Sequence, residues 1–214
     1  ALPFILCRTV DWVFEVRRKA VDVLETKIIP GNAGAFIKLL PLMNRLALSS
    51  RAMKSLEAKV YSLYHSDLGI QLLLSALKTE PQHIRMLICR ILDNFLPDIP
   101  ADILDIVTND CDLAVRFWLT RWEERMRSFN PTKALQLRKL LIYDPSAKIR
   151  SNMIMASIAA KDDDVNDILY KGLFDKSSSI RDMARYYIKK NKALDFASFY
   201  REMLKEKGVK LQIA

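Results

Sequence analysis

The chain has 214 residues, of which 50% are hydrophobic and 28% are charged, as in an ordinary folded protein. Its formal net charge of +9 can attract nucleic acid, an acidic membrane surface or an acidic protein, although a solvated basic surface needs no such partner. No apolar run approaches the roughly 18 residues of a membrane helix, and no charged region precedes the first apolar residues, so we expect neither a membrane span nor a signal peptide.

Helical periodicity of the hydrophobic residues accounts for almost the whole chain, whereas glycine is scarce and β-type alternation is nearly absent. The pattern predicts helices over residues 12–28, 35–48, 50–64, 66–78, 82–96, 101–109, 113–127, 131–143, 146–160, 163–174, 178–190 and 193–207. Residues 30–34 are the strongest turn signal, and Pro41 is expected to kink or divide its helix. We expect Asn130 and the run Asp162–Asp164 to cap the helices that follow them, and residues 209–214 to form a loose tail.

The three cysteines, Cys7, Cys89 and Cys111, are odd in number and widely spaced. They fit neither a disulfide framework nor a zinc knuckle. We therefore expect buried, reduced thiols and a cytoplasmic protein.

One short unit recurs along the chain. Asp144-Pro-Ser-Ala-Lys-Ile-Arg150 is followed 31 residues later by Asp175-Lys-Ser-Ser-Ser-Ile-Arg181, and the same unit begins at Asp11 and at Asp110. Each copy is an Asp followed six residues later by an Arg with a β-branched apolar residue before it. With two weaker copies included, the Arg residues stand at positions 17, 51, 85, 116, 150 and 181, in steps of 31 or 34. This spacing is typical of stacked helix pairs in a solenoid.

The pairs Asp11/Arg17, Asp110/Arg116, Asp144/Arg150 and Asp175/Arg181 make the chain resemble the HEAT-repeat family, in particular its short bacterial type related to phycobilisome-lyase repeats. The resemblance implies an all-α, right-handed α-solenoid of about six helix pairs, which we expect as one domain over residues 1–208. The chain lacks an initiator Met, so we expect it to be a processed product or a piece of a longer solenoid.

The resemblance also implies that each Asp caps the second helix of a repeat and that each Arg bridges neighbouring repeats as a ladder. Physical chemistry agrees, because a carboxylate at a helix start accepts backbone N–H groups and a guanidinium binds carboxylates as a planar fork. Arg51 and Arg85 have Arg45 and Thr79 in place of the Asp, so weaker ladders or different caps are expected there. Phosphate binding is the alternative role for these arginines. The predicted structural ladder comprises Asp11, Arg17, Arg51, Arg85, Asp110, Arg116, Asp144, Arg150, Asp175 and Arg181.

Two surfaces are candidates for binding a partner. If the residue before each Arg faces the core, helical geometry places the positions one, five and eight after it on the opposite side, which the resemblance implies is the concave one. The candidate partner groove contains Leu56, Met86, Arg90, Phe117, Arg121, Met155 and Tyr186. Its mixed apolar and charged character favours a protein partner, although these residues could equally pack against neighbouring helices. The candidate basic patch contains Arg125, Arg127, Arg138, Lys139, Arg185, Lys189 and Lys190.

Catalytic and metal-binding signatures are missing from the sequence. His65 and His83 have no metal-ligand spacing, no nucleotide-binding or nucleophile motif is present, and Asp162–Asp164 lacks the rest of a calcium loop. One enzymatic alternative remains, because HEAT-like alkylpurine DNA glycosylases are also small, basic and helical. Residues of the types they use lie close in this sequence, namely Asp112, Trp118, Arg121 and Trp122.

The sequence therefore predicts a non-catalytic HEAT-repeat scaffold without a cofactor, which binds a protein partner through its concave groove or its basic edge. The alternative is a nucleic-acid-binding protein, including a glycosylase-like one. The two differ in salt dependence, because a protein that neutralises phosphates loses affinity steeply as salt rises.

Overall fold

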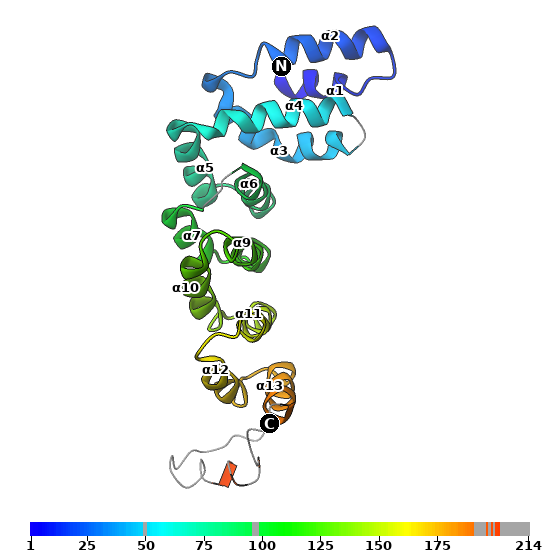
Figure 1. Cartoon of the computed structure of the whole chain (residues 1–214). Helices are drawn as coiled ribbons and strands as arrows, with labels where there is room; N and C mark the ends of the chain where they lie inside the picture. The colour runs from blue at the N-terminus through cyan, green and yellow to red at the C-terminus, as the bar shows by residue number, and fades with distance from the viewer. Residues whose placement is uncertain (49–50, 96–98, 191–195, 197, 199, 202–214) are drawn as a thin grey trace. The chain divides into compact units, whose positions relative to one another are not determined.

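The computed structural model describes residues 1–48, 51–95, 99–190, 196, 198, 200 and 201. These residues form helices and connecting turns, and no strand occurs among them, so the chain is all-α as predicted (Figure 1). The α-helices are α1 (Leu2–Arg8), α2 (Phe14–Glu25), α3 (Ala33–Ala47), α4 (Arg51–Ser62), α5 (Asp67–Thr79), α6 (Gln82–Phe95), α7 (Ala101–Thr108), α8 (Leu113–Arg116), α9 (Trp118–Met126), α10 (Pro131–Leu141), α11 (Ala147–Ala160), α12 (Val165–Gly172) and α13 (Ser178–Lys190). Short 3₁₀ turns, η1 (Pro30–Asn32) and η2 (Leu63–His65), precede α3 and follow α4.

The described residues group into two compact units, Ala1–Ala134 and Leu135–Ala214. Helix α10 begins in the first unit and ends in the second. The expected single domain over residues 1–208 stays a prediction, and the expected tail at 209–214 lies outside the described residues.

In the first unit, helices that follow one another in the chain pack together, α1 on α2, α3 on α4 and α5 on α6. Helix α3 also packs on α5 and α6, and α7 packs on α5, α8 and α9. The buried side chains include Phe36, Leu40, Tyr64 and Trp122. The Tyr64 hydroxyl donates a 2.9 Å hydrogen bond to the carbonyl oxygen of Ala33, which joins η2 to the start of α3.

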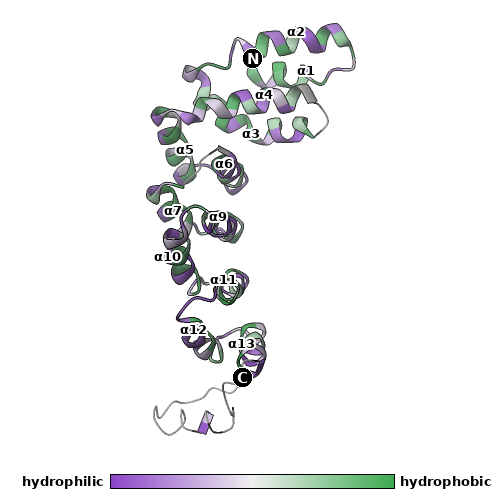
Figure 2. Ribbon diagram, in the orientation of Figure 1, coloured by the Kyte–Doolittle hydropathy of each residue, from purple (hydrophilic) through white to green (hydrophobic). Residues whose placement is uncertain are grey.

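The second unit is built around α12, which packs on both α11 and α13. Its core contains Ile154 from α11, Leu169 from α12, and Ile180 and Ala184 from α13. Gly172 permits close packing there, because a Cβ at this position would lie 3.2 Å from the Cβ of Ala184. Hydrophobic and hydrophilic residues share most helices, as expected for helices that bury one face (Figure 2).

Pro41 was expected to kink or divide its helix; α3 is not divided there, and the kink stays a prediction. Two elements differ from the sequence-based expectation. Helix α1 was not predicted, since it is short and buries only Leu6. The predicted helix 113–127 is interrupted at Phe117, where the backbone stays right-handed but Thr120 donates from both its N–H and its hydroxyl to the Phe117 carbonyl. A hydroxyl that competes for a helix carbonyl favours such a tightened turn.

Candidate functional site

Each aspartate of the recurring unit stabilises the turn that leads into the following helix. Asp11, Asp110, Asp144 and Asp175 each accept, through Oδ1, the backbone N–H two residues further on, at distances of 2.7 to 3.0 Å. A short carboxylate side chain is suited to this local turn because its reach matches the backbone two residues on. The resemblance implied that each Asp caps the helix, but for Asp11, Asp110 and Asp144 the N–H that is accepted belongs to the N-cap residue two positions on. These aspartates therefore form the turn before the helix and are not its N-cap.

The arginine of each unit binds back to the same turn. The Nη1 groups of Arg17, Arg116, Arg150 and Arg181 donate to the main-chain carbonyl of the Asp six residues earlier, at 2.7 or 2.8 Å. Arg85 has no such Asp and donates instead to the carbonyl of Glu80 at 2.9 Å. Because the arginine binds a main-chain carbonyl, this hydrogen bond can form in a unit that has no aspartate.

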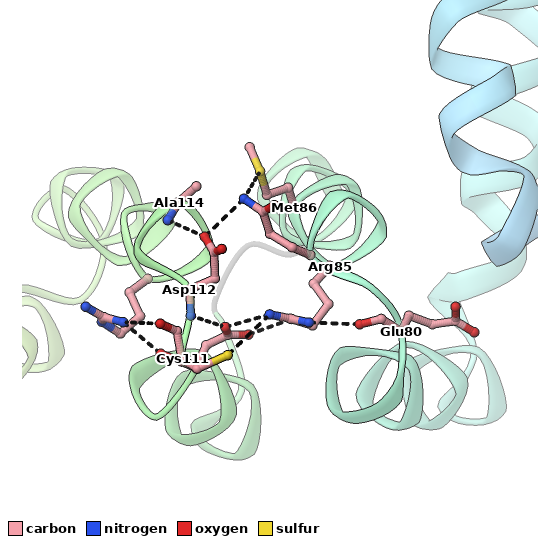
Figure 3. A network of polar contacts seen from close by, with 9 residues as sticks. Glu80, Arg85, Met86, Cys111, Asp112 and Ala114 are labelled. Carbon is pink, nitrogen blue, oxygen red and sulfur yellow. Dashed lines mark hydrogen bonds and ion pairs between the residues drawn. The ribbon is translucent and has the colours of Figure 1, made fainter.

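Arg85 and Arg150 also reach the aspartate of the next unit. The Arg85 Nε and Nη2 atoms lie 2.8 and 2.9 Å from the two Asp110 carboxylate oxygens (Figure 3). The Arg150 Nε and Nη2 atoms lie 2.8 and 2.6 Å from the Asp175 oxygens. Both pairs span 25 residues, and each lies within one compact unit. Forked bonds of this type combine charge with a fixed geometry.

These contacts alter the acidity of the groups that make them. The hydrogen bonds that Arg85 donates to the Asp110 carboxylate raise the pKa of the Arg85 guanidinium above its ordinary value. Burial by itself raises the pKa of Asp175, but the hydrogen bonds from Arg150 and from the Ser177 N–H, with the charges of Arg150 and Lys176, outweigh it. The pKa of Asp175 is therefore lowered, and the carboxylate stays charged.

At Arg85 the sequence predicted a weaker ladder or a different cap. The ladder is not weaker, since the fork of Arg85 onto Asp110 is as complete as that of Arg150, whereas its main-chain acceptor, Glu80, is a different one. Arg17 lies over the ring of Phe14, 5.5 Å from its centroid. The side chain of Arg51 lies outside the described part of the structure.

The candidate partner groove keeps only some of its members at the surface. Leu56 is buried in the core of the first unit, so it cannot contact a partner. Arg90 donates to the side-chain oxygen of Asn44, and Arg121 is ion-paired with Asp93 at 2.8 Å. Met86 and Phe117 are half-buried. In the second unit, Met155 on α11 is 40% exposed and Tyr186 on α13 is 60% exposed.

Most of the candidate basic patch is bound to carboxylates. Arg138 is buried and forks onto Asp162 at 2.8 and 3.0 Å, so it cannot reach a partner. Four further members hold carboxylates in the described structure: Lys139 with Asp164, Arg125 with Asp93, Arg127 with the buried Glu123, and Arg185 with Asp182. Lys189 and Lys190 are exposed near the end of α13. The positive charge of the sequence is therefore largely compensated where it is densest.

The acidic run Asp162–Asp164 has a different role from the predicted helix cap. Asp164 is the N-cap residue of α12, but its side chain makes no capping hydrogen bond. Asp162 and Asp164 instead bind Arg138 and Lys139 of α10.

Sequence reasoning also missed Asp93 as the partner of Arg121 and Arg125. The available signal was the acidic segment 93–112, which is followed by a segment rich in arginine.

The residues considered for chemistry are engaged in structural contacts. Trp122 is fully buried, so it cannot stack on a nucleic-acid base. Trp118 lies against the Arg121 guanidinium, 5.4 Å from ring centroid to Cζ. Asp112 accepts from the Ala114 N–H at 2.7 Å and from Gln82 at 3.1 Å (Figure 3).

Cysteine placement differs in part from the expectation of buried thiols. Cys89 is buried, whereas Cys7 and Cys111 are exposed. The Arg85 Nη2 group lies 3.9 Å from the Cys111 sulfur. The described residues contain no group of three or more His, Cys, Asp or Glu side chains arranged to hold a metal ion. None of the described helices is long and apolar enough to cross a membrane.

No family model matches the chain, and neither does any curated protein or solved structure. The resemblance to HEAT repeats therefore rests on the Asp–Arg units, and function must be argued from the geometry above.

Proposed function

We infer that the chain is a HEAT-like repeat protein, a right-handed α-solenoid that acts as a non-catalytic scaffold for a protein partner. Support for the repeat comes from Arg85–Asp110 and Arg150–Asp175, which use the same atoms at the same sequence separation in two separate units. Repeats whose neighbours interlock in this way form rigid supports for extended binding surfaces.

The partner surface that we assign lies on α11 and α13 of the second unit. Ser151 of α11 contacts Met183 of α13, with the hydroxyl 3.8 Å from the Met183 sulfur, so the two helices are neighbours. Met155 and Tyr186 are exposed on these helices, and the exposed Lys189 follows Tyr186 by three residues, about one helical turn. A Met and a Tyr next to positive charges are suited to an acidic protein segment with apolar side chains.

The observation that carries the proposal is the pairing of the basic residues with carboxylates. A nucleic-acid interface needs arginines and lysines that are free to replace phosphate counterions, and each ion pair removes one of them. The exposed Met155 and Tyr186 remain as uncharged contact area. The balance favours a protein partner over nucleic acid.

The test compares capture of partners from a cell extract by the wild-type chain and by a Met155→Glu/Tyr186→Ala double variant. A protein that binds the wild type and is lost from the double variant is expected. The matched control is Leu68→Glu, which places a carboxylate at an exposed apolar position of the first unit. Capture that is unchanged in the double variant, or equally lost in the control, would contradict this surface.

Anisotropy of labelled duplex DNA at several salt concentrations tests the nucleic-acid alternative. We expect weak binding. The logarithm of the association constant should change little with the logarithm of the salt concentration. Tight binding that falls steeply with salt would overturn the scaffold proposal and favour a nucleic-acid binder.

A further inference from the structure

The second unit contains a pocket that the proposed partner surface does not use. Its volume is about 340 Å³, at the lower end of the range for small-ligand sites. It lies where the end of α10 and the loop before α11 meet α12 and the loop before α13. Met155 and Tyr186 do not line it, so a ligand here would be independent of the α11–α13 surface.

Part of the pocket lining is apolar. It includes Ile142 after α10, Ile154 of α11 and Ile168 of α12. Ile154 and Ile168 are almost fully buried, and Ile142 is partly buried. These branched side chains offer a surface that a compact apolar group could cover, which favours binding because apolar area leaves water.

The pocket lining also carries polar donors at the surface. Tyr143, Lys171 and Lys176 are exposed and line the pocket. The Lys171 Nζ lies 3.4 Å from the Tyr143 hydroxyl oxygen, so the two groups converge. Within the described structure no carboxylate lies at ion-pair distance from Lys171 or Lys176, in contrast to Lys139, which is 3.0 Å from Asp164. Two ammonium groups and a hydroxyl are thus available to an anion.

The charges inside the pocket set the charge of its ligand. Arg150 and Asp175 line the pocket as a buried forked pair and neutralise each other. Arg150 has five N–H groups, and four of them bind Asp175 and the carbonyls of Asp144 and Pro145. The lining also contains Lys171, Lys176 and Asp144. In total it carries three positive and two negative side chains. The surplus of one positive charge matches a ligand with a single negative charge.

We propose that this pocket binds a carboxylate that stands next to a branched apolar group, as in the C-terminal residue of a peptide or in a small free acid. The carboxylate binds Lys171, Lys176 and the Tyr143 hydroxyl, and the branched group packs on the three isoleucines. A carboxylate accepts several charged or polar donors at once, whereas an amide in its place carries no charge to balance the lysines.

The test follows the methyl groups of Ile142, Ile154 and Ile168 by NMR in the full chain labelled at isoleucine. The probes are N-acetyl-leucine and its amide, and a five-residue peptide ending in leucine with either a free or an amidated terminus. Saturable shifts of these methyls with the free carboxylates are expected, with affinity at least about ten-fold weaker for the amides. Tighter binding of the peptide would assign the site to a chain terminus, and equal affinity would assign it to a small acid.

Variants at the exposed lysines leave the core intact and separate binding from folding. Lys171→Ala and Lys176→Ala are each expected to weaken binding of the free carboxylate by about ten-fold, and Tyr143→Phe by a few-fold. Lys139→Ala, which removes a lysine already paired with Asp164, is the matched control and should bind as the wild type does. The proposal is overturned by an absence of shifts up to roughly 10 mM probe, by equal affinity for acid and amide, or by unchanged affinity in both lysine variants.

Discussion

Arg150 and Asp175 lie 25 residues apart in the sequence, yet two hydrogen bonds of 2.8 and 2.6 Å join them at the start of α13. Their side chains are only 5% and 15% exposed. Arg150 also binds two carbonyls of its own turn, so one side chain connects two helix starts. This arrangement is the physical link between the repeated sequence and the packing of the second unit.

Replacement of Arg150 by Ala should destabilise the chain strongly. The substitution removes the Arg150 donors from two carbonyls and from the Asp175 carboxylate, which keeps the Ser177 N–H, and breaking a buried pair in this way costs about 3–5 kcal/mol of unfolding free energy. Urea unfolding followed by circular dichroism measures the effect. The matched control is Arg185→Ala, because the Arg185–Asp182 side chains are 46% and 69% exposed and such pairs contribute about 0–1 kcal/mol. Equal losses in the two variants would contradict the structural role of Arg150.

The lowered pKa of Asp175 predicts a stability that depends on pH. A carboxyl whose pKa is lower in the folded state stabilises the fold fully above its unfolded pKa, about 4, and loses this contribution as pH falls through the folded value. The stability difference between wild type and Asp175→Asn should therefore be largest near neutral pH and should narrow below about pH 4. Urea unfolding at several pH values measures it, with Asp163→Asn as the control for removing one exposed charge. A difference that stays constant down to about pH 2 would contradict the assignment.

For the expected helix caps, the sequence predicted contacts correctly where both partners lie in one stretch of chain, and failed where they lie on different helices. Asn130 was expected to cap α10, and its side chain accepts the Lys133 N–H at 3.1 Å, because cap and helix lie in one stretch of chain. Asp162–Asp164 looked like the same signal and was misread, since its partners Arg138 and Lys139 lie on another helix. The pattern of one stretch of chain does not show which distant side chains its carboxylates will bind.

The end of α11 was predicted correctly at residue 160, although the usual sequence signal for a helix end is missing. Helix α11 ends with Lys161 in a left-handed conformation, φ 56°, where the sequence offers no glycine to mark the end. The Asp162 N–H then binds the Ser157 carbonyl at 3.1 Å and closes the helix. In the candidate groove, Leu56 and Tyr186 occupy equivalent positions of the repeat, but one is buried and the other exposed. A periodic pattern predicts which side of a helix a residue lies on, but it does not predict whether another helix packs against that side.

Two glycines should respond to alanine in opposite ways. A Cβ at Gly69 would lie 2.5 Å from the Leu63 carbonyl oxygen and from the Tyr64 Cα, and backbone atoms cannot move aside easily. Gly69→Ala should therefore cost about 2 kcal/mol or more. Gly34 lies in the first turn of α3 with nothing within 4 Å of its Cβ position, so Gly34→Ala should stabilise the chain by about 0.5–1 kcal/mol. Thermal unfolding compares the two, and a loss of stability in both variants would contradict this account.

The three cysteines should differ in reactivity. Burial raises the pKa of the Cys89 thiol well above its ordinary value, and the thiolate is the form that reacts. Cys7 and Cys111 are exposed. Brief alkylation of the native protein with iodoacetamide, followed by peptide mass spectrometry, should label Cys7 and Cys111 and leave Cys89 unmodified. Labelling in denaturant is the control and should modify all three, whereas rapid modification of native Cys89 would show that it is accessible.

A final pair of substitutions tests what a buried polar atom contributes. The Trp122 Nε1 is buried without a hydrogen-bond partner in the described structure, whereas the equally buried Tyr64 hydroxyl donates to the Ala33 carbonyl at 2.9 Å. Tyr64→Phe should cost about 1–2 kcal/mol, because the Ala33 carbonyl loses its donor. Trp122→Phe removes an unsatisfied donor, which offsets much of the cavity left by the smaller ring, so its cost should stay well below the roughly 3–5 kcal/mol expected for Trp122→Ala. Urea unfolding of the three variants measures these differences. If Trp122→Phe costs as much as Trp122→Ala, the indole N–H stabilises the fold through a contact that this geometry does not contain.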